Sequence, residues 1–297
     1  MHMRNFRSPA DFIRIGDFLV ETYQPGDRFQ NWRQSRWEYM FYHPMLDAAS
    51  LGRIAIWEDE GRIVGVANYE GALGEAYFHL RPGYEHLKPE MLAYAEANLA
   101  GVDEKGRNCL TVYINDFDTE FAATAGERGY QREEGRAWMS RFDIAEPFPA
   151  IELPEGYRLQ SLAEENDLHK VNRVLYRGFN HEGPPPEEDL PGRRSMQSAP
   201  NWCGELNLVV VAPSGEYVAY CGMWYDPVHR VCDVEPVATD PDYRGRGLGK
   251  AAVLEGIRRC KELGATAAWV GSGQKFYEAI GFRKMFAHCL WTKRWDA

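Results

Sequence analysis

Short apolar runs separated by turn residues recur along the chain, and they predict β-strands in both halves. In the first half, residues 54–58 and 63–69 predict two strands joined by a glycine turn. In the second half, residues 208–212 and 217–224 predict a similar pair, again joined by a glycine turn. Each half therefore contains a predicted hairpin.

The elements after each hairpin also follow one order. An extended run leads into a long helix, then a strand, then a short helix that ends in glycine and an aromatic residue. The long helices are predicted over residues 89–99 and 248–263, and Val253, Ile257 and Cys260 of the second recur at helical spacing. The later elements are strands 109–115 and 265–271 and the pairs Gly129-Tyr130 and Gly281-Phe282.

Landmarks of the two halves are separated by nearly constant distances along the chain. The separations are 154 residues for Gly61 and Gly215, 159 for Tyr84 and Tyr243, and 152 for Gly129 and Gly281. Any two domains of this class could share such a rhythm, but the shared landmarks favour duplication of a whole domain. The predicted fold is two tandem α/β domains, each a mixed, mostly antiparallel sheet flanked by helices.

A proline-rich segment, residues 144–156, lies almost at the midpoint of the 297 residues. Proline fixes φ and disfavours helix in the preceding residue, so the segment is predicted to be an extended linker. We place the boundary near Phe148, which gives domains of residues 1–147 and 148–297. The chain length suits two domains of average size.

The charge of the chain limits its partners. The formal net charge is -10 and the pI is about 5.4. Sequence-independent binding of nucleic acid needs a basic surface, so no nucleic-acid partner is expected. An acidic protein attracts cationic small molecules, although net charge is only weak support for a cationic substrate.

The cysteines and the N-terminus indicate a compartment. None of the six cysteines forms a Cys-x-x-Cys pair, so neither a metal site nor a disulfide framework is expected. The first residues have no long apolar core typical of a signal peptide, and no apolar run has the length of a membrane span. A cytoplasmic protein without a membrane partner is expected.

The segment from Arg244 to Lys250 carries three glycines and two arginines between a predicted strand and helix. Glycine lets a backbone approach a ligand closely, and the amides at a helix start bind anions. The spacing fits neither the Rossmann fingerprint nor the P-loop. The segment alone therefore predicts a phosphate-binding loop, with a glycine-rich turn and solvated arginines as the alternative.

Flanking residues favour the first alternative. Arg244-x-x-Gly247-x-Gly249, the preceding residues 237–243 and the downstream segment 276–282 resemble the GNAT superfamily of acyl-CoA-dependent N-acetyltransferases. The resemblance covers about the last 90 residues. It implies that acetyl-CoA is the cosubstrate, with no metal. Its pantetheine arm would lie between the separating strands that contain Val237 and Trp269. The residues implied to contact acetyl-CoA are Val237, Ala238, Thr239, Arg244, Gly245, Arg246, Gly247, Leu248, Gly249 and Lys250.

The chemistry needs a base and a proton donor. A primary amine has a pKa of about 10 and must lose a proton before it attacks a thioester. Asp233 and Glu235 lie two apart on one predicted strand and share a face, and Glu235 is nearer the expected thioester. The resemblance implies Glu235 as base, with Asp233 second, and Tyr277 as the acid that protonates the leaving thiolate. The alternatives are an edge-strand carboxylate and a core tyrosine.

The backbone near Val237 and the segment before Tyr277 would also contribute to the site. A backbone N–H near Val237 would bind the tetrahedral oxyanion. Many GNAT proteins carry an asparagine before the tyrosine, whereas this chain has Gly271-Ser272-Gly273-Gln274. Ser272 or Gln274 would contact the cosubstrate instead.

The first half lacks the phosphate chemistry. Aligned on its Pro-x-Tyr landmark, it has Glu85, Lys88 and Glu90 where the second half has Arg244, Gly247 and Gly249. Two carboxylates and added side chains oppose a polyphosphate. The chain therefore resembles the tandem-GNAT group, with a degenerate first domain that does not bind CoA.

The function predicted is acetyl transfer to an amine by direct attack in a ternary complex. An inactive acyl-CoA-binding sensor or scaffold is the alternative. The acceptor stays open between a small-molecule amine, a polyamine and a peptide amine. Homodimer formation also stays open, because the first half could serve as a purely structural or dimerisation domain.

Overall fold

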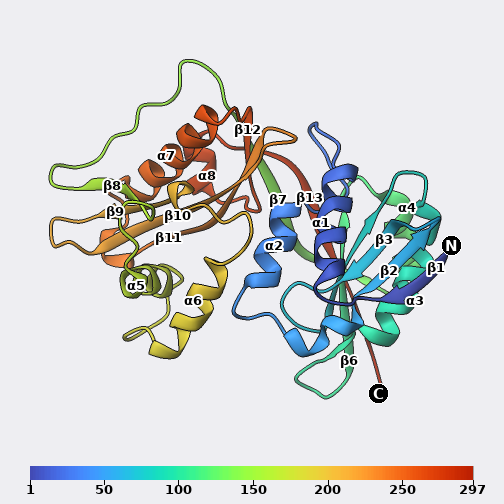
Figure 1. Cartoon of the computed structure of the whole chain (residues 1–297). Coiled ribbons are helices and arrows are strands. Elements are labelled where there is room, and N and C mark those ends of the chain that lie inside the picture. The colour runs from blue at the N-terminus through green and yellow to red at the C-terminus, as the bar shows by residue number, and fades with distance from the viewer. Residues whose placement is uncertain (297) are drawn as a thin grey trace. The chain divides into compact units, whose positions relative to one another are not determined.

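The computed structural model describes residues 1–296, which form two compact units (Figure 1). Unit 1 comprises residues 1–41, 45–139 and 285–296, and unit 2 comprises residues 42–44 and 140–284. These units are defined by contacts. The division at residues 147 and 148 concerns the duplicated domains and stays a prediction.

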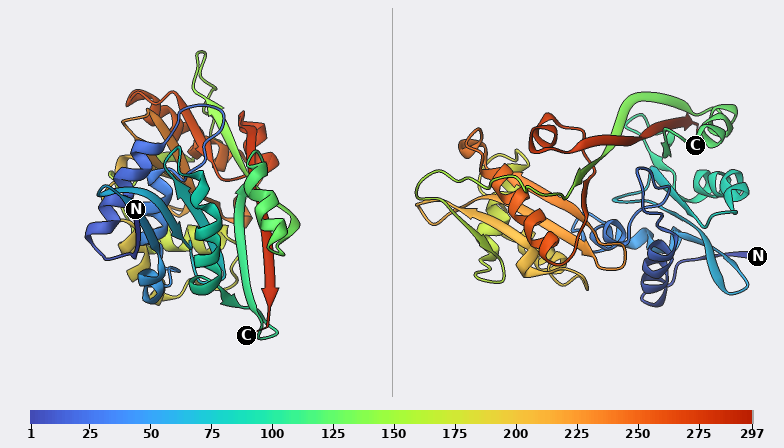
Figure 2. Two further views of the ribbon diagram at one scale, coloured as in Figure 1. Left: turned by 90° about the vertical axis from the view of Figure 1, so that its right-hand side faces the viewer. Right: turned by 90° about the horizontal axis from the view of Figure 1, so that it is seen from above.

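Unit 1 contains a mixed sheet in the order β1-β2-β3-β4-β6-β13, in which only β4 and β6 are parallel neighbours. The last strand, red in Figure 2, lies beside β6. Four helices accompany the sheet. The elements are β1 (His2–Asn5), α1 (Ala10–Thr22), α2 (Gln34–Tyr42), β2 (Ala55–Asp59), β3 (Arg62–Asn68), β4 (Glu75–Leu80), α3 (Lys88–Asn98), β5 (Gly101–Val102), β6 (Asn108–Asn115), α4 (Thr119–Glu127) and β13 (Arg283–Trp295).

Unit 2 contains the order β7-β12-β11-β10-β9-β8, in which β7 takes part through its residues 140–143 and only β11 and β12 are parallel. Figure 1 shows α7 on one face of this sheet and α5 on the other. The elements are β7 (Gln131–Asp143), β8 (Arg158–Ser161), α5 (Leu168–Gly178), α6 (Leu190–Met196), β9 (Asn207–Val211), β10 (Tyr217–Asp226), β11 (Val231–Thr239), α7 (Leu248–Glu262), β12 (Ala267–Val270) and α8 (Lys275–Ile280). Short 3-10 turns are η1 (Ala48–Arg53), η2 (Glu85–Leu87), η3 (Glu187–Asp189), η4 (Gly204–Leu206) and η5 (Pro241–Tyr243).

The predicted elements agree with the structure within a few residues at each end. The helix predicted over 248–263 is α7, and the strands predicted over 208–212 and 217–224 are β9 and β10. No helix or strand lies between Asp143 and Arg158, as the proline content predicts. Helix α5, which the sequence interpretation did not include, contributes to the site.

Helix α5 forms for reasons that its sequence contains. Asp167 caps the N-terminus by accepting hydrogen bonds from the amides of His169 and Lys170. Val171, Val174 and Leu175 follow at helical spacing, and all are buried. These apolar side chains dock the helix on the sheet of unit 2.

Candidate active site

Strands β11 and β12 separate at the centre of unit 2. Their parallel pairing covers Val231 to Asp233 on β11 and Ala267 to Trp269 on β12. Strand β12 ends one residue later, whereas β11 continues to Thr239. The parallel pairing therefore ends at Asp233 and Trp269, as the sequence interpretation predicts for the strands that contain Val237 and Trp269.

A β-bulge lies on β11 just beyond this point. The antiparallel register with β10 shifts between Cys221 and Met223, so that Glu235 and Pro236 lie opposite Gly222. A Cβ atom on Gly222 would be 2.6 Å from the carbonyl oxygen of Glu235, so the two backbones need glycine here. Bulges redirect side chains near ligand sites. Glu235 therefore lies where the strand changes direction, and Asp233 lies in the regular part of the sheet.

The loop after β11 ends in an uncapped helix N-terminus. Gly247 is the N-cap residue of α7, has φ of 79°, and provides no side chain to cap the first amides. The first turn contains no acidic residue. Amide groups at such a terminus carry partial positive charge and bind anions. Gly245 also has positive φ, and a Cβ at either glycine would meet no atom within 4 Å.

Gly249 lets α7 approach β11. A Cβ atom there would be 2.7 Å from Oγ1 of Thr239 and 3.4 Å from the ring of Phe276. The helix start, the end of β11 and α8 therefore meet around this residue.

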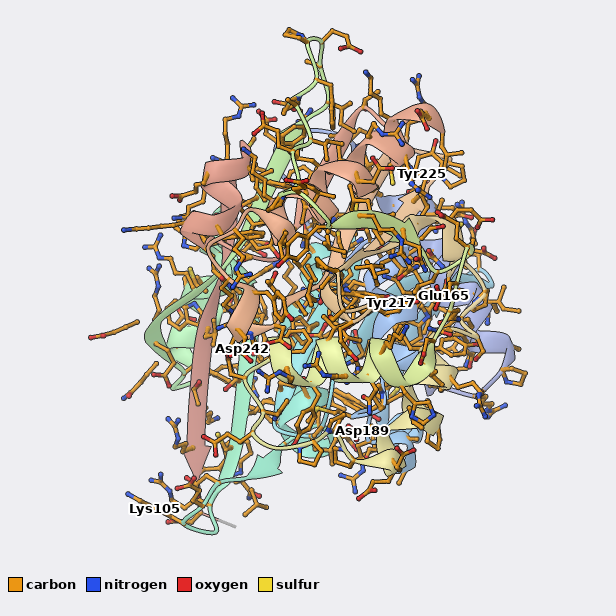
Figure 3. All side chains as sticks on the ribbon, turned by 90° about the vertical axis from the view of Figure 1, so that its left-hand side faces the viewer. Lys105, Glu165, Asp189, Tyr217, Tyr225 and Asp242 are labelled. Atoms are coloured by element: carbon orange, nitrogen blue, oxygen red, sulfur yellow. The ribbon has the colours of Figure 1, made fainter. Side chains whose placement is uncertain are left out.

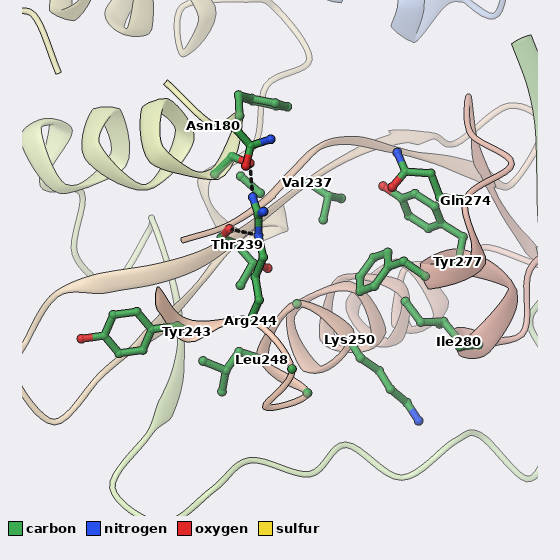
Figure 4. A pocket seen from close by; sticks show the side chains of 18 residues that line it. Asn180, Val237, Thr239, Tyr243, Arg244, Leu248, Lys250, Gln274, Tyr277 and Ile280 are labelled. Carbon is green, nitrogen blue, oxygen red and sulfur yellow. Dashed lines mark hydrogen bonds between the residues drawn. The ribbon is translucent and has the colours of Figure 1, made fainter. Parts of the chain in front are cut away.

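A pocket of about 690 Å³ opens between these elements (Figure 4). A cavity of this size is typical of small-molecule and cofactor sites. The residues proposed from the sequence that line it are Val237, Ala238, Thr239, Arg244, Gly245, Gly247, Leu248, Gly249, Lys250 and Tyr277. Arg246, Glu235 and Asp233 are not among the lining residues.

The two arginines of the loop have protein partners. The guanidinium of Arg244 donates hydrogen bonds to the carbonyl oxygens of Thr239 (3.1 Å) and Gly178 (2.8 Å) (Figure 4). Arg246 donates to the hydroxyl of Tyr157 (3.0 Å) and to the carbonyl oxygen of Asp242 (3.2 Å). Arg246 lines a neighbouring pocket instead. Both arginines thus stabilise the loop itself.

Tyr277 lies on α8 at the inner part of the pocket and is only 8% exposed. Burial raises the pKa of its hydroxyl above the ordinary value, and the nearby Cys221 and Glu235 raise this pKa further. The hydroxyl is therefore protonated at neutral pH and able to donate a proton.

Sequence interpretation missed one wall of the pocket. Gly178, Phe179 and Asn180, at the end of α5, line it opposite the loop. No local motif marks these residues, because they reach the site only through the packing of α5 on the sheet. Phe276, Ala279 and Ile280 of α8 also line the pocket, as does Gln274, whereas Ser272 does not.

Comparisons with known proteins agree with this geometry. The profile of the Acetyltransferase (GNAT) family matches residues 172–282. A mycothiol acetyltransferase of Thermomonospora curvata is 25% identical over 250 residues, which cover 80% of each chain. A mycothiol acetyltransferase of Geodermatophilus obscurus is 25% identical over 263 residues, which cover 79% of this chain and 80% of the relative.

The chain carries a GNAT acetyltransferase domain and is an N-acetyltransferase. The family uses acetyl-CoA as cosubstrate, and its enzymes transfer the acetyl group to amines. Among residues 1–296, no group of three or more His, Cys, Asp or Glu side chains is arranged to hold a metal ion. No helix in the same residues has the length and apolar character of a membrane span.

Solved structures show that the GNAT fold extends over both units. A tandem GNAT protein from the clavulanic acid biosynthesis pathway aligns with a TM-score of 0.66 at 16% identity. The alignment covers 99% of this chain and 98% of that protein. A GCN5-related N-acetyltransferase from Sphaerobacter thermophilus aligns with a TM-score of 0.65 at 19% identity, with 99% and 95% coverage. At these identities the similarity concerns the fold.

The equivalent cleft of unit 1 in this acetyltransferase has a different lining. The cavity there measures about 20 Å³ and is lined by residues that include Lys88 and Asp118, which form an ion pair. Glu90 accepts a hydrogen bond from the indole of Trp57 (2.8 Å), and Glu85 accepts one from the amide of Gly83. The three residues that replace the loop chemistry in unit 1 are thus all engaged within the unit.

Proposed function

We propose that the pocket of unit 2 binds acetyl-CoA, with the pyrophosphate on the loop amides between Gly245 and Lys250. The observation that carries this proposal is the uncapped N-terminus of α7, which faces the pocket. Its two glycines with positive φ leave the loop surface open for close approach by a polyanion. Lys250, exposed at the pocket rim, adds positive charge.

The pantetheine arm would follow β11 inward from the loop. Thr239, Ala238 and Val237 line the pocket in that order from the loop toward the bulge. The parallel pairing of β11 with β12 ends at Asp233, and the part of β11 from Val237 to Thr239 borders the pocket. A backbone N–H near Val237 remains our proposed donor to the oxyanion of the tetrahedral intermediate.

Glu235 would accept the proton of the amine, directly or through a water molecule. Its place at the bulge supports it over Asp233, which lies in the part of β11 that pairs with β12. The amine nitrogen would then form its bond to the acetyl carbon. The C–S bond breaks on collapse of the intermediate, and the Tyr277 hydroxyl would give its proton to the departing sulfur.

Calorimetric titration with acetyl-CoA tests the proposed site. We expect binding by the wild type and loss of measurable binding in Gly247→Glu, because the carboxylate would face the phosphates and α-helical amides. Gly215→Glu is the matched control, since Gly215 also has positive φ and open space but lies in the turn between β9 and β10. A wild type that does not bind, or a Gly247→Glu variant that binds normally, would contradict the proposal.

The acceptor would be a small-molecule amine. Several relatives are named mycothiol acetyltransferases, so a mycothiol-type acceptor belongs in the first screen, together with polyamines and peptides. Release of the free thiol of CoA provides the readout. We also propose that unit 1 binds no CoA, which the Lys88–Asp118 ion pair in its small cleft supports. Titration that finds one acetyl-CoA per chain would agree with this, and two would contradict it.

A further inference from the structure

The loop that follows β11 is joined to the end of α5 by a cluster of charged side chains. Arg177, the residue before the end of α5, contacts Asp240 and Asp242 of the loop. We propose that Arg177 is a positioning residue for acetyl-CoA, which holds the phosphate-binding loop and the opposite pocket wall at a fixed separation. This inference rests on the proposed function.

The contacts of Arg177 are bidentate and in part deeply buried. Its Nε and Nη2 donate hydrogen bonds to the two carboxylate oxygens of Asp240, at 2.7 and 3.0 Å. Nη2 also contacts the carboxylate of Asp242 at 2.6 Å. Such a planar, forked pairing restrains both position and orientation. Figure 3 shows Asp242 near the C-terminal end of α5, and Tyr217 and Glu165 near the other end.

Asp240 is the buried residue through which the loop is held. Its side chain is completely buried, and it also accepts a hydrogen bond from the amide of Asp242. Burial opposes ionisation of this carboxyl, but the hydrogen bonds of Arg177 and of the Asp242 amide, together with the charges of Arg177 and Arg173, outweigh it. The pKa of Asp240 is consequently below its usual value. A buried carboxylate with several donors tolerates little displacement.

Arg244 provides the reciprocal connection. It extends from the loop to the carbonyl oxygen of Gly178, the last residue of α5. A cation at a helix C-terminus interacts favourably with the helix dipole and with unpaired carbonyl groups. Arg177 of the helix thus contacts the loop, and Arg244 of the loop contacts the end of the helix. Arg244 therefore acts here as a helix cap in addition to lining the pocket.

Helix α5 and strand β11 are packed so closely that the pocket width depends on the position of the helix end. A Cβ atom on Gly178 would lie 2.6 Å from the Cβ of Ala238, so α5 and β11 touch through glycine. Phe179 and Asn180 continue directly from this contact into the pocket lining. A small movement of the helix end would change the pocket width beside the loop amides. Ligand sites depend on positions held within fractions of an ångström by such supporting contacts.

The Arg177–Asp240 contact, which we call the clamp, lies in the last turn of α5, and Arg173, one turn earlier, also pairs with Asp240 at 3.2 Å. The rest of the helix is held by its buried apolar side chains, Val171, Val174 and Leu175, and by the cap at Asp167. Loss of Arg177 should therefore leave the helix folded and docked while its last turn loosens. This separation of effects makes the positioning role testable.

The experiment uses the full chain and the variant Arg177→Gln. We expect the dissociation constant for acetyl-CoA, measured by calorimetry, to rise about 10- to 100-fold, the effect of displacing a supporting contact by up to about 1 Å. The conservative Arg177→Lys keeps the charge but not the fork, and should recover part of the affinity. Arg258→Gln is the matched control: Arg258 also joins two carboxylates, those of Glu255 and Glu262, but along α7. Its affinity should match the wild type.

A double variant tests the same role if Arg177→Gln fails to fold. Arg177→Gln leaves the buried Asp240 with Arg173 as its remaining arginine partner, at 3.2 Å, whereas Arg177→Gln/Asp240→Asn also removes the buried charge. We expect the double variant to fold and still bind acetyl-CoA at least about tenfold more weakly, equal to about 1.4 kcal/mol. Wild-type affinity in a folded Arg177→Gln, or in the double variant, would overturn the positioning role. Absence of binding by the wild type would instead overturn the proposed site itself.

Discussion

The clefts of the two units share a backbone plan and differ in what fills them. In unit 2, β11 and β12 are parallel neighbours over three residue pairs, and in unit 1, β4 and β6 are parallel neighbours over two. In each unit a helix starts shortly after the first strand of this pair: α7 follows β11, and α3 follows β4. Yet the cavity measures about 690 Å³ in unit 2 and about 20 Å³ in unit 1.

Side chains account for this difference. Lys88 is the first residue of α3, and its ammonium group pairs with Asp118 while lying over the ring of Phe121. At the corresponding start of α7, glycine leaves the amides open. The landmark offset of 159 residues aligns Ala76 with Glu235, and the offset of 152 residues aligns Ala125 with Tyr277. Unit 1 thus lacks the proposed base and acid as well as the phosphate loop. The shared fold thus provides the cleft, whereas glycines and two titratable side chains provide the proposed chemistry.

The largest expected effect concerns Glu235. We expect Glu235→Gln to lower kcat about 10²- to 10⁴-fold with little change in acetyl-CoA affinity, because the amide cannot accept the amine proton. Steady-state kinetics with an acceptor found by screening would measure this. Asp233→Asn is the control, for which a smaller loss is expected. Equal losses in both variants would contradict the choice of Glu235.

Acid should weaken unit 1 through two buried histidines. Burial, reinforced by the charge of Arg36, lowers the pKa of His79 and of His288 to about 3. The unfolded chain binds protons at these residues below about pH 6.5, and the folded chain does not. Stability is therefore retained above pH 6.5 and lost as pH falls toward 3, by about 2 kcal/mol per histidine at pH 5.

Hydrogen exchange at pH 7 and pH 5 would test this difference between the units. We expect amides of β4 and β6 to lose protection at pH 5, and the His79→Gln/His288→Gln variant to lose less of its own protection. If the protection factors of the β4 and β6 amides, corrected for the intrinsic exchange rate at each pH, are equal at pH 7 and pH 5 in the wild type, these histidines do not control the acid response of unit 1.

Removal of the Tyr277 hydroxyl should have an intermediate effect. We expect Tyr277→Phe to lower kcat about 10-fold or more, because the leaving sulfur loses its proton donor. Since the pKa of Tyr277 is raised, the wild type should keep its rate as pH rises to about 10. Activity that falls with a pKa below 10 in the wild type, and not in Tyr277→Phe, would place the tyrosine in a different environment. Tyr225→Phe, at a hydroxyl bonded to Leu263 outside the pocket, is the control.

The smallest effect is expected from opening the cleft of unit 1. Lys88→Ala removes an almost buried ammonium group and leaves Asp118 without this partner. We expect Tm to fall by a few degrees, corresponding to about 1–2 kcal/mol, and acetyl-CoA stoichiometry to stay unchanged. Differential scanning calorimetry and isothermal titration would measure the two quantities. A second acetyl-CoA bound by Lys88→Ala would show that the lysine alone closes a working site.

Local pattern was sufficient for much of this protein. Alternating and helical apolar spacing located β9, β10 and α7, because these periods depend only on which side of an element is buried. Glycines at Gly245, Gly247 and Gly249 pointed to the phosphate loop, since positive φ and close approach are properties that a residue type largely dictates. Eleven of the proposed residues, Gln274 among them, consequently line one pocket.

Only the tertiary structure decided the rest. Helix α5 lies far from the loop in the sequence, so neither the pocket wall at Gly178 to Asn180 nor the Arg177–Asp240 clamp follows from local pattern. Arg244 is implied by the resemblance to contact the cosubstrate, and only the packing of α5 shows that its guanidinium also has two backbone carbonyls as partners. The sequence by itself determined which backbone segments are suited to bind a polyanion. The packing of distant segments decided which side chains surround that loop and hold it in place, because such contacts depend on three-dimensional proximity and have no local signature.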